Sequence, residues 1–177
     1  MTNVDYAKLY FKYPVPTPIM GEPTNKTINR LKLELRANSS SVETDLGGGD
    51  HGYLGLYLLV ADYARILPTP TRFTATAWSG TLTIDAAATA VEAVHAKEMH
   101  HEAMRLYREC KNVEKALLRH TQNALEAKYI EPLINEDTGL IEDDLPTVLQ
   151  YLDTNYGIVQ SEEVKTKESE VLSMSFN

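Results

Sequence analysis

The chain has little cysteine, no long apolar run and an excess of acidic over basic residues. Cys110 is the only cysteine among 177 residues, which excludes an intramolecular disulfide framework and a cysteine-rich zinc site. No apolar run approaches the roughly 20 residues that a membrane span requires, and residues 1–5 do not begin a secretory signal. We therefore expect a cytoplasmic protein that does not associate with membranes.

The net charge of −8 is unevenly distributed along the chain. Through Arg36 there are six Lys or Arg against three acids, whereas residues 129–164 carry nine acids and no Lys or Arg. Binding to backbone phosphates needs clustered Lys and Arg, so the chain as a whole is a poor candidate for binding nucleic acid. Two interpretations of this charge asymmetry stay open. The basic N-terminal region of one copy could attract the acidic C-terminal region of another, or the charges could form an ordinary solvated surface.

Residues 1–25 are expected to form an extended N-terminal arm, because prolines block helix formation and favour polyproline-like backbone. Its aromatic residues need apolar cover, from the same domain or from a neighbouring copy. We expect copies of the chain to exchange this assembly arm. Its defining residues are Tyr6, Tyr10, Phe11, Tyr13, Pro14, Pro16 and Pro18.

Residues 26–177 predict an all-α fold of five or six helices, in one compact domain or in two small lobes. Apolar periodicity and capping residues place helices at 26–37, 53–67 (one helix or two short ones, with Asp62 as an internal cap), 86–110, 112–127, 145–155 and 161–173. Asp85 and Asn112 are expected to cap the third and fourth helices, and Asp144 and Gly157 to bound the fifth. Seven residues spaced by three and four form one apolar stripe on the longest predicted helix: Ala96, Met99, Ala103, Leu106, Cys110, Val113 and Leu117.

A loop with five glycines in nine residues lies between two of these helical segments. It has neither the lysine of a P-loop nor the G-x-G-x-x-G pattern, and an acidic residue at the mouth of the following helix would repel a phosphate. We interpret it as a structural connection of defined shape, in which Asp50 caps a helix beginning near Gly52. Its residues are Gly47, Gly48, Gly49, Asp50, His51, Gly52 and Gly55.

Glu-x-x-His, the local unit of di-iron bundles, occurs twice, ending at His95 and at His101. A di-iron site needs these units on separate helices, whereas here both lie on one helix, about 120° apart. The face carrying His95, Glu98 and Glu102 is therefore interpreted as polar surface, although a small metal-dependent helical enzyme stays an alternative.

Two further patterns are weak candidates for catalysis. Asp137-Thr138-Gly139 spells the aspartic-protease triad but lacks flanking strands, so a turn is expected. Cys110, with His120 ten residues later, is interpreted as a small core residue rather than a nucleophile. We predict no catalytic centre, no metal, no cofactor and no small-molecule substrate.

Seven blocks of sequence, taken in their order and spacing, carry a family resemblance: residues 17–24, 35–38, 46–56, 102–109, 113–117, 127–130 and 151–157. Together these blocks resemble the Gag-like capsid region of Ty1/copia-type retrotransposons, including divergent algal and oomycete-type copies. The resemblance implies a helical structural protein that binds itself and assembles into a virus-like particle in the cytoplasm. The chain has no zinc knuckle or basic tail, so contact with RNA is left to segments absent from this chain. A domesticated helical adaptor for another protein is the alternative.

Overall fold

The computed structural model describes residues 6–12, 15–44, 51–66 and 81–157. They form the five α-helices α1 (Tyr6–Tyr10), α2 (Asn25–Ser41), α3 (Val60–Ile66), α4 (Ala90–Ala124) and α5 (Leu145–Tyr156), with the 3-10 turns η2 (Leu54–Leu56), η3 (Ala127–Tyr129) and η4 (Glu131–Leu133). In these ranges the only β-pairing is an isolated bridge between Ile134 and Ile141, so the all-α prediction is confirmed. No helix of the described part combines the length and apolarity needed to cross a membrane.

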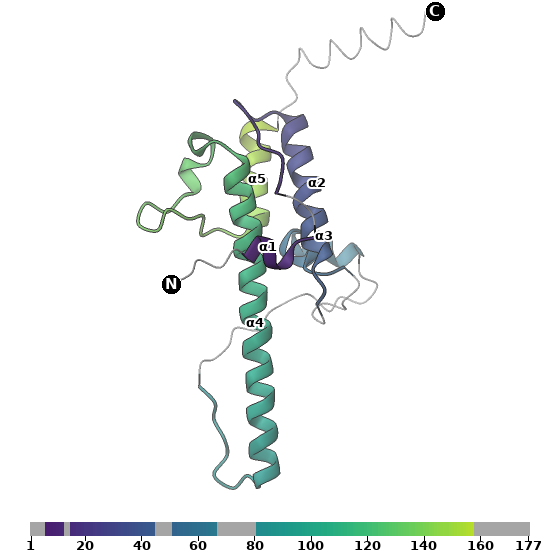
Figure 1. Ribbon diagram of the computed structural model, residues 1–177, viewed down its shortest axis with the longest axis vertical. Helices are drawn as coiled ribbons and strands as arrows, with labels where there is room; N and C mark the ends of the chain where they lie inside the picture. The colour runs from purple at the N-terminus through teal and green to yellow at the C-terminus, as the bar shows by residue number, and fades with distance from the viewer. Residues whose placement is uncertain (1–5, 13–14, 45–50, 67–80, 158–177) are drawn as a thin grey trace, which may run out of the picture.

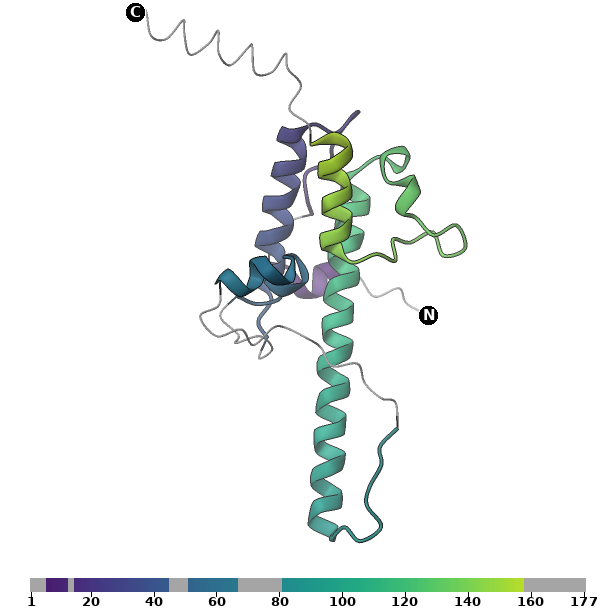
Figure 2. The same cartoon turned by 180° about the vertical axis from the view of Figure 1, so that it is seen from behind.

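The body of the protein is built around the C-terminal half of α4. Helices α1, α2 and α5 all contact α4, and Figures 1 and 2 show them gathered at that half while the N-terminal half of α4 extends beyond them. The core joins Leu31 and Leu35 of α2 to Val113 and Leu117 of α4, and all four are fully buried. Four buried residues of α5 belong to the same core: Leu145, Val148, Leu149 and Leu152.

Helix α2 is longer than the sequence predicts. It begins with a capping box, in which the Thr24 hydroxyl accepts from the Thr27 amide and the Thr27 hydroxyl accepts from the Thr24 amide. The predicted end near residue 37 is wrong, because the helix continues to Ser41. The hydroxyls of Ser39 and Ser41 donate to carbonyls three residues back, so their side chains bond within the helix rather than ending it.

Helix α4 is continuous for 35 residues, which corrects two predictions. Asn112 does not interrupt it. Asp85 does not cap it either: its carboxylate accepts from the Ala87 amide in a preceding turn. The true cap is Thr89, which forms a capping box with Glu92. The capping box outcompetes an isolated aspartate because it satisfies two backbone donors at once.

The two residues predicted to bound α5 are confirmed as its caps, and the helix ends at Tyr156, one residue later than predicted. Asp144 accepts from the Thr147 amide at 2.9 Å, and the Gly157 amide donates to Asp153 at the C-cap. The helix is joined to α2 by an ion pair between Lys32 and Asp153 and by a hydrogen bond of 2.8 Å from Asn25 to the Gly157 carbonyl. Here the basic N-terminal part and the acidic C-terminal part of one chain meet each other.

The N-terminal segment differs from the extended arm that was predicted. Residues Tyr6–Tyr10 are helical, because the first proline comes only at residue 14 and leaves the preceding turn free to form. The ring of Phe11 contacts the ring of His120 edge to face, with centroids 5.0 Å apart, which holds this segment against α4. Tyr10 also packs against the core. Tyr13 and Pro14 lie outside the described residues.

The extended part of the arm, from Val15 onward, packs in part on its own chain. Pro16 and Ile19 are buried, whereas Pro18 is exposed. The Ile19 amide donates to the Ala124 carbonyl at 2.7 Å, and the Gly21 amide donates to the Glu126 carboxylate at 2.7 Å. The same chain therefore covers part of the arm, and exchange of the arm between copies stays a prediction.

The segment after the glycine loop forms two short helices, η2 and α3, as one of the two alternatives predicted. Asp62 is not a cap, since it lies in the first turn of α3 and pairs with Arg65 at 3.4 Å. The predicted helix at 161–173 lies outside the described residues.

Candidate functional site

The described end of the glycine loop is packed onto the C-terminus of α2. Gly52 has a φ of +53°, and a Cβ at this position would lie 2.4 Å from the Val42 carbonyl oxygen and 2.7 Å from that of Ser40. Only glycine combines this backbone conformation with such a close approach. The amide of Tyr53 then donates to the Ser39 carbonyl at 2.9 Å. Residues 45–50, including Gly47, Gly48, Gly49 and Asp50, lie outside the described residues; His51 and Gly55 are half-buried.

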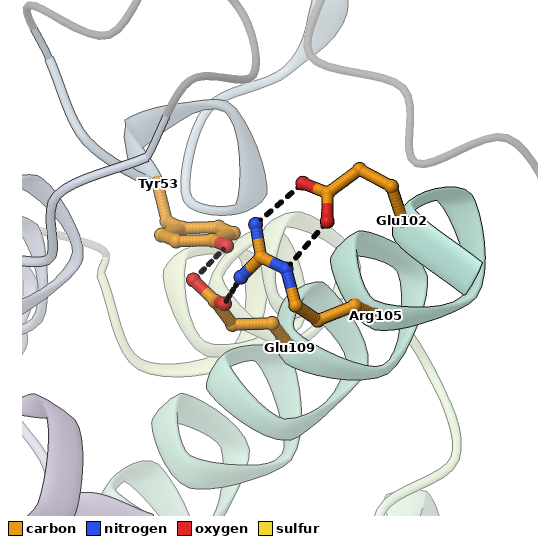
Figure 3. A network of polar contacts seen from close by, with 4 residues as sticks. All are labelled: Tyr53, Glu102, Arg105 and Glu109. Carbon is orange, nitrogen blue, oxygen red and sulfur yellow. Dashed lines mark hydrogen bonds and ion pairs between the residues drawn. The ribbon is translucent and has the colours of Figure 1, made fainter. Parts of the chain in front are cut away.

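A network of polar side chains connects this loop to α4 (Figure 3). Tyr53 is fully buried, and its hydroxyl donates to Oε1 of Glu109 at 2.8 Å. Oε2 of the same carboxylate accepts from Arg105 at 2.9 Å. Arg105 also holds both carboxylate oxygens of Glu102, at 2.7 and 2.9 Å. One guanidinium thus bridges two carboxylates one helical turn to either side of it.

Burial raises the pKa of Tyr53, and the hydrogen bond to Glu109 raises it further against a lowering contribution from Thr44. The pKa of Glu102 is lowered, chiefly by the hydrogen bond from Arg105. The phenol of Tyr53 therefore stays a neutral donor, and the carboxylate of Glu102 stays a charged acceptor. This charge state suits a fixed structural connection, in which each donor has an acceptor, better than proton transfer.

The network lies where α4 leaves the packed body. The buried residues of α4 begin at Cys110. Toward the N-terminus of the helix, Val91, Val94 and Met99 have exposed fractions of 79%, 55% and 58%. Of the predicted apolar stripe, Cys110, Val113 and Leu117 are buried, Ala96 and Leu106 are half-buried, and Met99 and Ala103 are exposed. The stripe is therefore covered over only half of its length.

The predicted polar face of α4 is exposed. His95, Glu98 and Glu102 are all on the surface, and Glu102 is bound to Arg105. Within the described ranges no three His, Cys, Asp or Glu residues are grouped so that they could hold a metal ion. Cys110 is buried in the core as expected, and burial raises the pKa of its thiol to about 12, which keeps it in the unreactive protonated form.

The Asp137-Thr138-Gly139 segment is a turn, as predicted. The Asn135 side chain accepts from the amides of Asp137 and Thr138, and Gly139 has a φ of +65°. The isolated bridge between Ile134 and Ile141 closes the turn at its base. Exposed and on a loop tip, the aspartate has none of the apolar strand setting that its motif requires.

Comparison of the chain with protein-family models, with curated proteins and with solved structures finds no match.

Sequence reasoning missed the network around Arg105. The spacing of Glu102, Arg105 and Glu109 by three and four is typical of ion pairs along a helix and could have shown its α4 part. The contribution of Tyr53 had no such signal, since it lies 56 residues from Glu109 along the chain. Together these residues fix the glycine loop against the point from which α4 projects.

Proposed function

We propose that this is a structural protein that assembles with copies of itself into a capsid-like particle, tube or lattice, in the manner of Gag-like proteins. The observation that carries the proposal is the projecting N-terminal half of α4, which holds exposed apolar residues away from the packed body (Figures 1 and 2). Exposed apolar surface on a projecting element is typical of protein contact sites. A particle of this kind would lie in the cytoplasm.

The resemblance noted in the sequence supports the same proposal. Two of its blocks, residues 46–56 and 102–109, meet through the hydrogen bond from Tyr53 to Glu109. Two others, residues 17–24 and 151–157, are also bonded to the body: the Ile19 amide donates to the Ala124 carbonyl, and the Gly157 carbonyl accepts from Asn25. The resembling blocks therefore contribute contacts that hold the body together and fix the base of the projecting helix.

The test is the mass of the purified protein as concentration and ionic strength vary. We expect sedimentation velocity to show species larger than a monomer that increase with concentration, and electron microscopy to show closed or repeating objects. Surface charge pairs weaken as salt increases, so a comparison of low and high salt separates ionic from apolar contacts. A monomer under every condition would refute the proposal.

The second candidate is an adaptor that uses the same projecting helix to bind a different protein. The exposed residues of α4 favour it equally, because apolar surface alone does not specify the partner. A strictly monomeric chain that still binds one defined partner through α4 would identify an adaptor. A metal-dependent enzyme, the third alternative, predicts iron or zinc near one per chain that is lost when His95 and Glu98 are both replaced by alanine.

A further inference from the structure

The apolar stripe of α4 follows a heptad pattern across the boundary of the packed body. From Ala96 onward its members alternate in steps of three and four, the spacing of helices that pair along their length. The body covers the C-terminal part from Cys110. We name the remaining four residues the open seam, and they are Ala96, Met99, Ala103 and Leu106.

Side-chain size alternates along the open seam between small and large. In an antiparallel pair of such helices, Ala96 of one copy lies opposite Leu106 of the other, and Met99 lies opposite Ala103. Every layer then combines one small and one large side chain, which fills space evenly. A parallel pair would instead set alanine against alanine and methionine against methionine. The open seam is therefore complementary to itself in one orientation.

The charged residues Glu102 and Arg105 beside the open seam are compatible with antiparallel pairing. Antiparallel pairing in this register is centred on residue 101, so the Glu102 residues of the two copies lie within about 3 Å of each other along the helix axis, beside the seam. Arg105 of the same chain binds both oxygens of this carboxylate, at 2.7 and 2.9 Å. Each copy therefore brings to the contact a Glu102 carboxylate that is already bound to a guanidinium rather than a free carboxylate, so the repulsion between like charges is reduced.

We infer that the open seam is a homotypic contact, in which α4 of one copy packs antiparallel against α4 of a second copy. This inference rests on the proposed self-assembly and names the surface that performs it. Residues 90–109 span about 30 Å, and a strip about 10 Å wide of that length covers roughly 600 Å² over both copies. Stable complexes bury about 1,200 to 2,000 Å². A single seam contact is therefore weak, which fits an assembly held by several contacts per copy.

A matched pair of substitutions tests the contact. Met99 and Val94 are 58% and 55% exposed on the same helix, and the step of five positions from one to the other turns them about 140° apart. Met99→Lys places a charge in the seam, and Val94→Lys places the same charge outside it. Circular dichroism is expected to show equal helix content and equal melting for both. By sedimentation, Met99→Lys is expected to weaken self-association at least tenfold, and Val94→Lys less than twofold.

The outcomes separate the contact from the wider function. A monomeric unsubstituted protein refutes the proposed self-assembly itself. An assembling protein in which Met99→Lys and Val94→Lys behave alike leaves the self-assembly standing and refutes the seam.

The orientation of the pair is tested by mixing Met99→Cys and Ala103→Cys proteins and treating them with a short bismaleimide. The buried Cys110 does not compete for the reagent. We expect cross-links between the two variants to exceed those within either one. Preferential linking of Met99→Cys to itself would show parallel pairing and overturn the inference.

Discussion

Replacement of Gly52 by alanine is the sharpest test of how the glycine loop is held. The added Cβ would lie 2.4 Å from the Val42 oxygen and 2.7 Å from the Ser40 oxygen, both of them backbone atoms that cannot rotate away. A non-glycine residue in the left-handed region costs about 1 to 2 kcal/mol. Overpacking adds about 1 to 3 kcal/mol. The sum is a large part of the roughly 5 to 15 kcal/mol that stabilises a domain.

Gly139→Ala is the matched control for this substitution. Gly139 also has a positive φ, of +65°, but nothing lies within 4 Å of a Cβ built there. The left-handed strain and the loss of unfolded-state entropy are therefore common to both variants and cancel in the comparison. Urea denaturation followed by circular dichroism is expected to show Gly52→Ala less stable than Gly139→Ala by about 1 to 3 kcal/mol. Equal stability of the two variants would refute the close approach of the loop to α2.

Three further predictions concern the body and the projecting helix. Tyr53→Phe is expected to lower the free energy of unfolding by about 1.5 to 3 kcal/mol at neutral pH, the usual contribution of a hydrogen bond to a charged group. The pKa of Tyr53 is raised in the folded state above its unfolded value of about 10. Its contribution to the free energy of unfolding is therefore complete below pH about 10 and is lost as the pH rises above that value. Urea midpoints measured across this range should therefore fall less steeply in the variant, and an unchanged slope would contradict this. Thr89→Ala removes an N-cap worth about 1 kcal/mol, so amide hydrogen exchange should accelerate in the first turn of α4. The melting temperature of the body should stay unchanged, and a lower one would show that this end of α4 supports the fold. Ile19→Ala should destabilise the monomer by about 2 to 5 kcal/mol, because the arm packs on its own chain; an effect on assembly alone would instead indicate exchange between copies.

The local features of the helices could be predicted from the sequence. Asp144 and Gly157 bound α5 because a helix end is satisfied by side chains and backbone within a few residues of it. Spacings of three and four along α4 placed Cys110, Val113 and Leu117 on one face, and all three are buried. The Asp137-Thr138-Gly139 turn likewise needs only its neighbour Asn135. Each of these outcomes depends on interactions over about one helical turn.

Helix lengths were predicted less well, because they depend on competition between neighbouring signals. Asn112 could end a helix in isolation, but it lies within a segment whose flanking residues Cys110 and Val113 are buried against the body, so the helix continues. Asp85 and Thr89 are both residues that can cap a helix. Thr89 caps α4 because Glu92, three residues later, completes a capping box with it.

Only the tertiary structure decided which surfaces are covered. The apolar stripe of α4 has the same spacing on both sides of Cys110, yet α1, α2 and α5 gather at one half of the helix and leave Met99 exposed on the other. The aromatic residues Tyr10 and Phe11 of the arm pack in part against the core of their own chain, a contact that their spacing along the arm does not specify. The contact of Tyr53 with Glu109 spans 56 residues. Contacts of this kind follow from where distant segments meet in space, which the spacing of residues along one helix does not specify.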